Sequence, residues 1–212
     1  MGCDISTDST DVFCHCTEVD NALLLQCVRE HGTACHLTIE RSTVDAAGIA
    51  QLGRMPELRL FSIDNSKSNN RFVVNDDVFE FVARNPSITH LGLMGCSFEF
   101  SGQSWVKPLV KIDQLVLDNS DCGDSQLEAL LERIDSMIIM AMRGCPLTNH
   151  ALEIIRHVPS VEKLYLERTN IDDACLHLLL SLPFLKSVTL DGTHVRDAVA
   201  IQIQNGLAHA NR

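Results

Sequence analysis

The sequence predicts an α/β fold in which short parallel strands alternate with helices in a stack of similar units. Three observations support this prediction: a repeated apolar pattern, a strand-like alternation inside each copy, and helical spacing after each copy. The pattern apolar-x-x-apolar-x-apolar has its third apolar position at Ile39, Ile63, Leu93, Leu117, Met142, Leu166 and Leu190. The successive spacings are 24, 30, 24, 25, 24 and 24 residues. A nearly fixed period in this range is the signature of a repeat fold.

Each copy begins with a short strand. In the sixth copy, Leu164, Tyr165 and Leu166 alternate apolar, polar, apolar, which is the pattern of a half-buried strand. Three residues past the third apolar position a small hydroxyl or thiol side chain recurs, and we expect it to bond the backbone of the turn. This ladder column comprises Ser42, Ser66, Cys96, Ser120, Cys145, Thr169 and Thr193.

Each copy then continues with a helical pattern. A polar side chain stands just before the helical apolar spacing, and we expect it to be the N-cap of the helix. These expected N-caps are Asp76, Asp124, Asn149, Asp173 and Asp197. Prolines follow near the expected helix ends, where a helix cannot continue. A single strand–turn–helix unit cannot bury its apolar face, so the units must stack, with a parallel sheet on a concave side and helices on a convex side.

Residues 34–205 resemble the leucine-rich repeat superfamily. Repeats such as Thr169-Asn170-Ile171-Asp172-Asp173-Ala174 are similar to the short cytosolic class, which includes the cysteine-containing repeats of F-box-type adaptors and many bacterial repeat proteins. The ladder column holds Ser, Thr or Cys here, where most extracellular members keep Asn. The resemblance implies a leucine-rich repeat solenoid, a right-handed α/β horseshoe arc. It also implies a role in scaffolding and recognition, although the superfamily serves unrelated partners.

The repeat divides the chain into three parts. We expect an N-terminal capping segment over residues 1–33, a repeat domain of about seven repeats over 34–205, and a C-terminal tail over 206–212. The second repeat carries about six extra residues between 66 and 72, which the composition predicts to be a loop. The third repeat has no clean helical pattern between 98 and 105.

Charge and hydropathy exclude several classes of partner. The net charge is −11, with no cluster of Lys and Arg, so nucleic acid is not expected as a partner. No apolar run approaches the ~20 residues that span a bilayer, and the N-terminus shows no apolar signal-peptide core. We therefore expect a soluble, cytoplasmic protein. Gly2 and Cys3 match a lipidation pattern, but their acidic neighbours make a membrane anchor unlikely on electrostatic grounds.

Nine cysteines require an explanation. Cys96 and Cys145 occupy one column two repeats apart, about 10 Å at the spacing of strands, which is too far for a disulfide. Free, buried cysteines are the simpler interpretation, and they suggest a reducing compartment. A zinc site is the alternative near the N-terminus, where Cys14, His15, Cys16, Cys27, His31, Cys35 and His36 gather. The Cys14-x-Cys16 spacing is unusual for zinc, so no metal and no cofactor is expected.

The candidate binding residues lie at the exposed positions of the predicted strands. The residue after each third apolar position is Glu40, Asp64, Met94, Asp118, Arg143, Glu167 and Asp191. Five of these seven are carboxylates, which predicts an acidic strip that attracts a basic segment of another protein. Tyr165 and Arg168 lie beside this strip and are of residue types that dominate interface energies. The alternative is a solvated polar face that only reflects the acidic composition.

We find no catalytic motif, so an enzyme is not expected: the chain has no phosphate-binding glycine loop, no HExxH and no GxSxG. The sequence thus predicts a protein–protein interaction module or scaffold that binds through its concave face. The expected contacts are Glu40, Asp64, Asp118, Arg143, Tyr165, Glu167, Arg168 and Asp191. The alternative is a substrate-recognition or regulatory subunit that docks to a larger enzyme assembly through its N-terminal cap.

Overall fold

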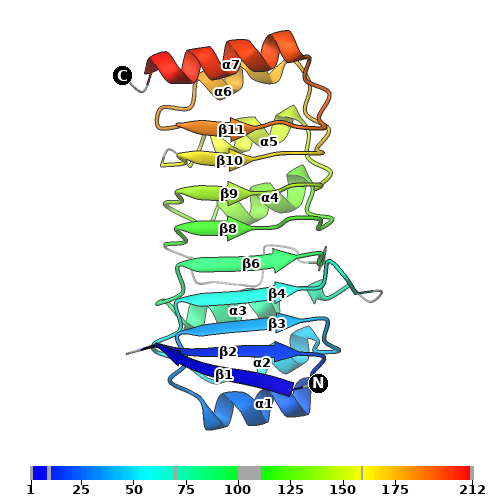
Figure 1. Cartoon of the computed structure of the whole chain (residues 1–212), viewed down its shortest axis with the longest axis vertical. Helices are drawn as coiled ribbons and strands as arrows, with labels where there is room; N and C mark the ends of the chain where they lie inside the picture. Colours follow the sequence, from blue (N-terminus) through cyan, green and yellow to red (C-terminus); the bar gives the residue numbers. More distant parts are fainter. Residues whose placement is uncertain (1, 9–10, 69–70, 100–110, 159, 211–212) are drawn as a thin grey trace.

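The structure is a computed structural model that describes residues 2–8, 11–68, 71–99, 111–158 and 160–210. Its main feature is one sheet in the strand order β1-β2-β3-β4-β6-β8-β9-β10-β11 (Figure 1). Its strands are β1 Gly2–Asp8, β2 Asp11–Thr17, β3 His36–Glu40, β4 Leu60–Asp64, β6 His90–Met94, β8 Gln114–Val116, β9 Ile139–Ala141, β10 Lys163–Tyr165 and β11 Ser187–Thr189. Only the β1–β2 pair among these is antiparallel. The described part of the chain therefore has the predicted α/β class, with a long and mostly parallel sheet.

The helices lie along one face of this sheet (Figure 1). They are α1 Asn21–Glu30, α2 Ala46–Ala50, α3 Asp76–Arg84, α4 Asp124–Leu131, α5 Asn149–Ile155, α6 Cys175–Leu180 and α7 Asp197–Ala210. A small parallel pair, β5 Val73–Val74 and β7 Ser97–Phe98, lies outside the main sheet. We call the face of the main sheet opposite the helices the open face.

The register of the strands places the repeated apolar positions in continuous columns. Ile39 is paired with Ile63, which is paired with Leu93, and the neighbouring column runs through Leu37 and Phe61. Six of the seven predicted third apolar positions, from Ile39 to Leu166, are at most 1% exposed. Leu190, the residue after β11, is only partly buried, and β11 is the last strand in the order of this sheet. The period therefore predicted the core correctly.

The ladder column bonds the turns as the sequence predicts. The Oγ1 of Thr169 donates to the carbonyl of Leu166 at 2.8 Å, and the Sγ of Cys145 donates to the carbonyl of Leu117 at 3.1 Å. Ser66 departs from the column, because its hydroxyl is exposed and donates to the carboxylate of Asp64 instead. This departure lies at the start of the expected insertion.

The predicted N-caps are wrong by one residue. The side chains that cap α3 and α5 belong to Asn75 and Thr148, and α4 begins after Gly123. Members of the predicted column instead join neighbouring repeats. Asp124 accepts hydrogen bonds from the backbone N–H and the hydroxyl of Thr148, and Asp173 accepts the backbone N–H of Arg196. A carboxylate at the start of one helix thus accepts hydrogen bonds from the next repeat and does not cap its own helix.

The N-terminal segment contains a strand–turn–helix unit of its own. In β2, Cys14 pairs with Leu37 and Cys16 pairs with Ile39, so the two cysteines occupy the core positions of a repeat. Helix α1 follows, capped by Asp20, whose side chain accepts the N–H of Leu23 at 2.9 Å. Strand β1 then covers the outer edge of β2.

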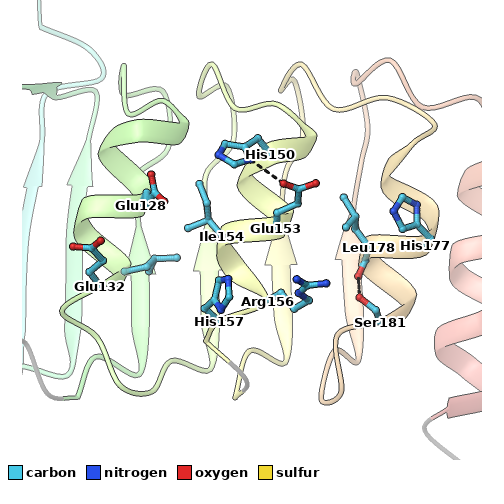
Figure 2. A pocket seen from close by; sticks show the side chains of 11 residues that line it. Glu128, Glu132, His150, Glu153, Ile154, Arg156, His157, His177, Leu178 and Ser181 are labelled. Carbon is cyan, nitrogen blue, oxygen red and sulfur yellow. Dashed lines mark hydrogen bonds and ion pairs between the residues drawn. The ribbon is translucent and has the colours of Figure 1, made fainter.

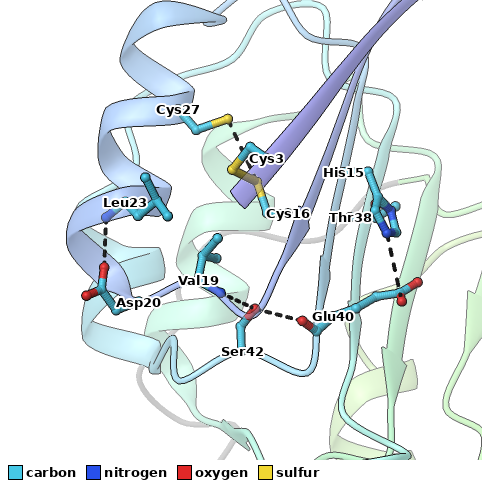
Figure 3. The surroundings of a disulfide bond; sticks show 10 residues. All are labelled: Cys3, His15, Cys16, Val19, Asp20, Leu23, Cys27, Thr38, Glu40 and Ser42. Carbon is cyan, nitrogen blue, oxygen red and sulfur yellow. Dashed lines mark hydrogen bonds and ion pairs between the residues drawn. A yellow bond between two sulfur atoms is a disulfide. The ribbon is translucent and has the colours of Figure 1, made fainter. Parts of the chain in front are cut away.

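The cysteines are not all free, which corrects the sequence-based interpretation. Cys3 and Cys16 form a disulfide between the paired strands β1 and β2 (Figure 3). The other seven cysteines are free and buried, including Cys96 and Cys145. The sequence could not indicate the bond, because Cys3 reaches Cys16 only through the β1–β2 hairpin.

Two expectations concern the remaining parts of the chain. The expected lack of a helix in the third repeat falls mainly on residues 100–110, outside the described residues. Helix α7 continues to Ala210, past the expected start of the tail, and Leu207 is buried in the core. Within the described residues, no helix has the length and apolar character needed to cross a bilayer.

Candidate functional site

The candidate site is the end of the open face where the parallel strands finish. We call Glu40, Asp64, Met94, Asp118, Arg143, Glu167 and Asp191 the charged row. The register pairs Glu40 with Asp64 and Asp64 with Met94, so the first three lie side by side. The later members follow the last residues of β8 to β11. The row exists because each member stands one position after the third apolar position of its repeat, so the alternation of an extended chain directs it to the opposite face.

Arg143 is the centre of the row. Its Nη1 lies 2.7 Å from the Oδ2 of Asp118, and its Nε lies 3.1 Å from the Oε2 of Glu167. The backbone N–H of Arg143 also donates to the Oδ1 of Asp118 at 2.8 Å. The Arg143, Asp118 and Glu167 side chains are 31%, 17% and 20% exposed. Three neighbouring repeats therefore share one partly buried group of charges.

Tyr165 completes this group from the open face of β10. The Cζ of the Arg143 guanidinium lies 4.4 Å from the centroid of the Tyr165 ring, within the range of a cation–π contact. The carboxylates hold the guanidinium while the aromatic ring covers it. We call Asp118, Arg143, Tyr165 and Glu167 the Arg143 cluster.

The cluster favours the charged forms of Glu167 and Arg143. For Glu167, burial raises the pKa, but its own backbone N–H and the neighbouring Thr189 hydroxyl and Arg143 guanidinium outweigh burial and hold the pKa below its ordinary value. For Arg143, burial lowers the pKa, and the contacts with Asp118 and Glu167 outweigh this and raise it. The charges are therefore held in place at neutral pH.

We expect Glu167→Gln to lower the free energy of unfolding by about 1 kcal/mol at neutral pH, because a charge-assisted bond to Arg143 is lost. A carboxylate whose folded pKa is depressed stabilises the fold above its unfolded pKa, and this stabilisation disappears as pH falls through the folded pKa. The difference between wild type and variant should thus shrink in acid. Urea unfolding across the acid range measures it. Asp191→Asn, an exposed member of the row, is the control; an equal effect there would contradict the role of the cluster.

The other predicted contacts lie apart from the cluster. Asp64 accepts hydrogen bonds from the N–H and hydroxyl of Ser66, and the Oε2 of Glu40 lies 3.8 Å from the Nε2 of His15. Asp191 is exposed at the C-terminal end of the row. Arg168 occupies the turn after β10 with φ 58°, exposed, and its side chain lies beside Gly192. Tyr165, the other predicted hot-spot residue, contacts Arg143.

A small depression lies between the acidic members of the row. Gly92 in β6 has no side chain, and the surrounding side chains leave a cavity of about 90 Å³ on the open face. It is lined by Leu60, Ser62, His90, Leu91, Gly92, Met94, Gln114 and Val116. This depression was not predicted from the sequence. Its signal was Gly92, a glycine at a strand position that leaves the space of a side chain unfilled.

The opposite face carries a larger groove. It has a volume of about 680 Å³ and lies over α4, α5 and α6 (Figure 2). Its side chains mix histidines with carboxylates, as in the 3.0 Å contact between the Nδ1 of His150 and the Oε2 of Glu153. Buried Leu131, Ile154 and Leu178 form its floor. The predicted contacts of the sequence analysis all lie elsewhere.

The ion pairs of Arg143 with Asp118 and Glu167 were not predicted from the sequence. Every member of the Arg143 cluster was among the predicted contacts, with the carboxylates interpreted as an acidic strip that attracts a basic segment. A signal was present, because Arg143 stands one repeat after Asp118 and one repeat before Glu167. Opposite charges at the same position of adjacent parallel strands are close enough to pair.

No family model matches this chain, and no curated protein matches it. The solved structures that resemble this chain include the following two. One is the tropomodulin C-terminal domain of Caenorhabditis elegans, with a TM-score of 0.43 and 12% identity over 90% of this chain and 93% of that chain. The other is an internalin from Listeria monocytogenes, with a TM-score of 0.47 and 12% identity over 84% of this chain and 54% of that chain.

Proposed function

We propose that this protein is a binding module or scaffold for another protein, and that it binds through the open face of its repeat sheet. In this proposal the repeats form a solenoid arc and the open face is its concave side. The protein contributes recognition and performs no chemical step. The observation that supports the proposal best is the Arg143 cluster, a set of charged and aromatic side chains oriented before any partner arrives.

Preorganisation is the reason why the cluster suits recognition. A partner that meets mobile charged side chains must first order them, and each ordered side chain costs binding free energy. In the cluster, Asp118 and Glu167 already hold the guanidinium of Arg143, and the ring of Tyr165 already lies against it. Arginine and tyrosine are also common among the residues that dominate interface energies.

The expected charge of the partner follows from the carboxylates of the row that Arg143 does not compensate. Arg143 compensates only one of the two carboxylate charges beside it in the middle of the row. The attraction for a basic segment therefore rests mainly on Glu40 and Asp64 at one end and Asp191 at the other. The depression at Gly92 lies beside Asp64 in the sheet. We therefore propose a partner segment that places basic residues on both sides of an apolar residue.

We expect Tyr165→Ala to weaken partner binding by about tenfold or more, the size typical of an aromatic contact at the centre of an interface. The measurement is quantitative affinity capture followed by titration of the purified partner. His177→Ala is the matched control, because His177 is exposed in the groove on the opposite face. Far-UV circular dichroism of both variants establishes that they are folded.

The outcomes separate the proposal from its alternative. Binding that survives Tyr165→Ala and is lost in His177→Ala would place recognition on the helix face and overturn the proposal. A third variant, Leu23→Ala, alters the exposed side of α1. A partner lost only in that variant would support a subunit that docks to an enzyme assembly through its N-terminal segment.

A further inference from the structure

The N-terminal end of the sheet contains a cluster of thiols that the open face does not involve. The Sγ atoms of Cys3, Cys16 and Cys27 all lie within 4.8 Å of one another. Figure 3 shows them between the β1–β2 hairpin and helix α1, with Cys27 reaching from the helix toward Cys16. Among the residues that the structure describes, this is the one group of three or more potential metal ligands at such distances.

A fourth cysteine joins the same layer. Cys14 is two residues before Cys16 in β2, so both side chains point to the helix side of the sheet. Burial and the neighbouring Cys27 thiol raise the pKa of Cys14 to about 12, so Cys14 and Cys27 lie near each other. Cys27 contacts Cys16, and Cys16 is bonded to Cys3.

The repeat pattern makes this composition unusual. The two core positions of β2 are cysteine, whereas the strands paired after it hold Leu37 and Ile39, then Phe61 and Ile63. Packing alone is satisfied by such branched apolar side chains, as the remaining core demonstrates. Thiols at both strand positions, on the facing helix and on the covering strand indicate chemistry in addition to packing.

We propose that the reduced cluster of Cys3, Cys14, Cys16 and Cys27 holds a thiophilic divalent metal ion of the zinc type, and that the Cys3–Cys16 disulfide is the oxidised, metal-free state. The spacing supports this assignment. Four sulfurs at about 2.3 Å from a tetrahedral zinc ion lie about 3.8 Å apart, and the Sγ atoms of Cys16 and Cys27 are 3.8 Å apart.

His15 and His36 are excluded as ligands by their positions. The Nδ1 of His15 is 2.6 Å from the Oγ1 of Thr38 on the open face, away from the thiols (Figure 3). His36 stacks edge-on against Phe13 with 4.6 Å between ring centroids. Cys35 donates its thiol to the carbonyl of Val12. The proposed ligands therefore differ from the cysteines and histidines that lie close together in the sequence, because they include Cys3 and leave out His15, Cys35 and His36.

The exchange between the two states balances with a dithiol reductant. The reductant gives two electrons and two protons to the Cys3–Cys16 bond and becomes a disulfide. The metal ion then binds the four sulfurs and displaces their protons to solvent. Bound metal would join β1, β2 and α1, whereas the disulfide joins β1 and β2 alone.

The experiment uses the full chain, purified with a phosphine reductant and without chelator. Elemental mass spectrometry is expected to find about one zinc ion per chain, and Co²⁺ titration should give the thiolate charge-transfer and tetrahedral ligand-field absorption. Cys27→Ser is expected to lose the bound zinc. Cys175→Ser is the matched control, because Cys175 is a free, buried cysteine in a distant repeat, and it should keep the zinc.

Three results would overturn the proposal. They are a reduced wild type that binds neither zinc nor cobalt, a folded Cys27→Ser that binds as much as wild type, and an oxidised chain that keeps the metal with the Cys3–Cys16 bond intact. If Cys27→Ser fails to fold, the cobalt spectrum of the reduced wild type decides: thiolate charge transfer supports the site, and its absence contradicts it.

Discussion

Gly95→Ala is expected to lower the free energy of unfolding by more than about 3 kcal/mol and the melting temperature by about 10 °C. Gly95 follows β6 with φ 64°, a conformation that costs an L-residue roughly 1 kcal/mol or more. The larger cost is steric. An added Cβ would lie 2.3 Å from the backbone N and 2.4 Å from the Cα of Ser66 in the preceding repeat. Backbone atoms cannot turn aside, so the spacing of the two repeats would have to change.

The control for this prediction is Gly53→Ala. An added Cβ there meets nothing within 4 Å, and the residue is exposed. We expect a change within about 0.5 kcal/mol of wild type, as is usual for surface substitutions. Thermal unfolding by circular dichroism compares both variants with wild type. A Gly95 variant as stable as the Gly53 variant would show that the repeats do not approach as closely as described.

Phe81→Ala is expected to lower the free energy of unfolding by about 3–5 kcal/mol, the range for removing a buried aromatic ring from a core. Phe81 lies on α3 and is 0% exposed. Its ring meets Phe61 of β4 in an edge-on contact, with 5.0 Å between centroids and 64° between planes. The substitution removes this contact and leaves a cavity between helix and sheet, which the surrounding rigid repeats cannot close.

Phe184→Ala is the control, because it removes the same aromatic ring from an exposed position. Phe184 is 57% exposed in the turn before β11, so its loss should change the free energy of unfolding by about 0.5 kcal/mol or less. Chemical denaturation with equal slopes for all three proteins gives the comparison. If Phe81→Ala were as mild as Phe184→Ala, the helix–sheet interface near α3 would be loosely packed.

Much of the fold was accessible from the sequence because repeat proteins are governed by local patterns. The position of Ile63 in its repeat is enough to place it in the core beside Ile39 and Leu93, since each repeat packs only on its neighbours. The ladder residue Thr169 was predicted for the same reason. Helix starts were less accurate: Asp124 looks like an N-cap, yet its carboxylate bonds Thr148 of the next repeat. The residue pattern within one repeat does not show how close its side chains lie to the next repeat, so it could not predict this hydrogen bond.

The candidate site was accessible only in part. The residues of the charged row follow from the strand alternation, so Asp118, Arg143 and Glu167 were found by position. Their ion pairing was not, because it depends on side-chain direction and on how far apart β8, β9 and β10 place their ends. The proposed partner chemistry changes with this result, since Arg143 offsets one of the two negative charges in the middle of the row and the ends attract a basic segment more strongly.

The sequence by itself determined the α/β class, the repeat positions that form the core, and the face of the sheet that carries the charged row. These properties depend on periodicity, which a chain of stacked units repeats from strand to strand. Only the tertiary structure decided that Cys3 lies against Cys16 and Cys27, and that Arg143 joins two carboxylates and Tyr165. Such contacts connect residues whose separation in space is unrelated to their separation in sequence, and they arise only when hairpin, helix and sheet are packed together.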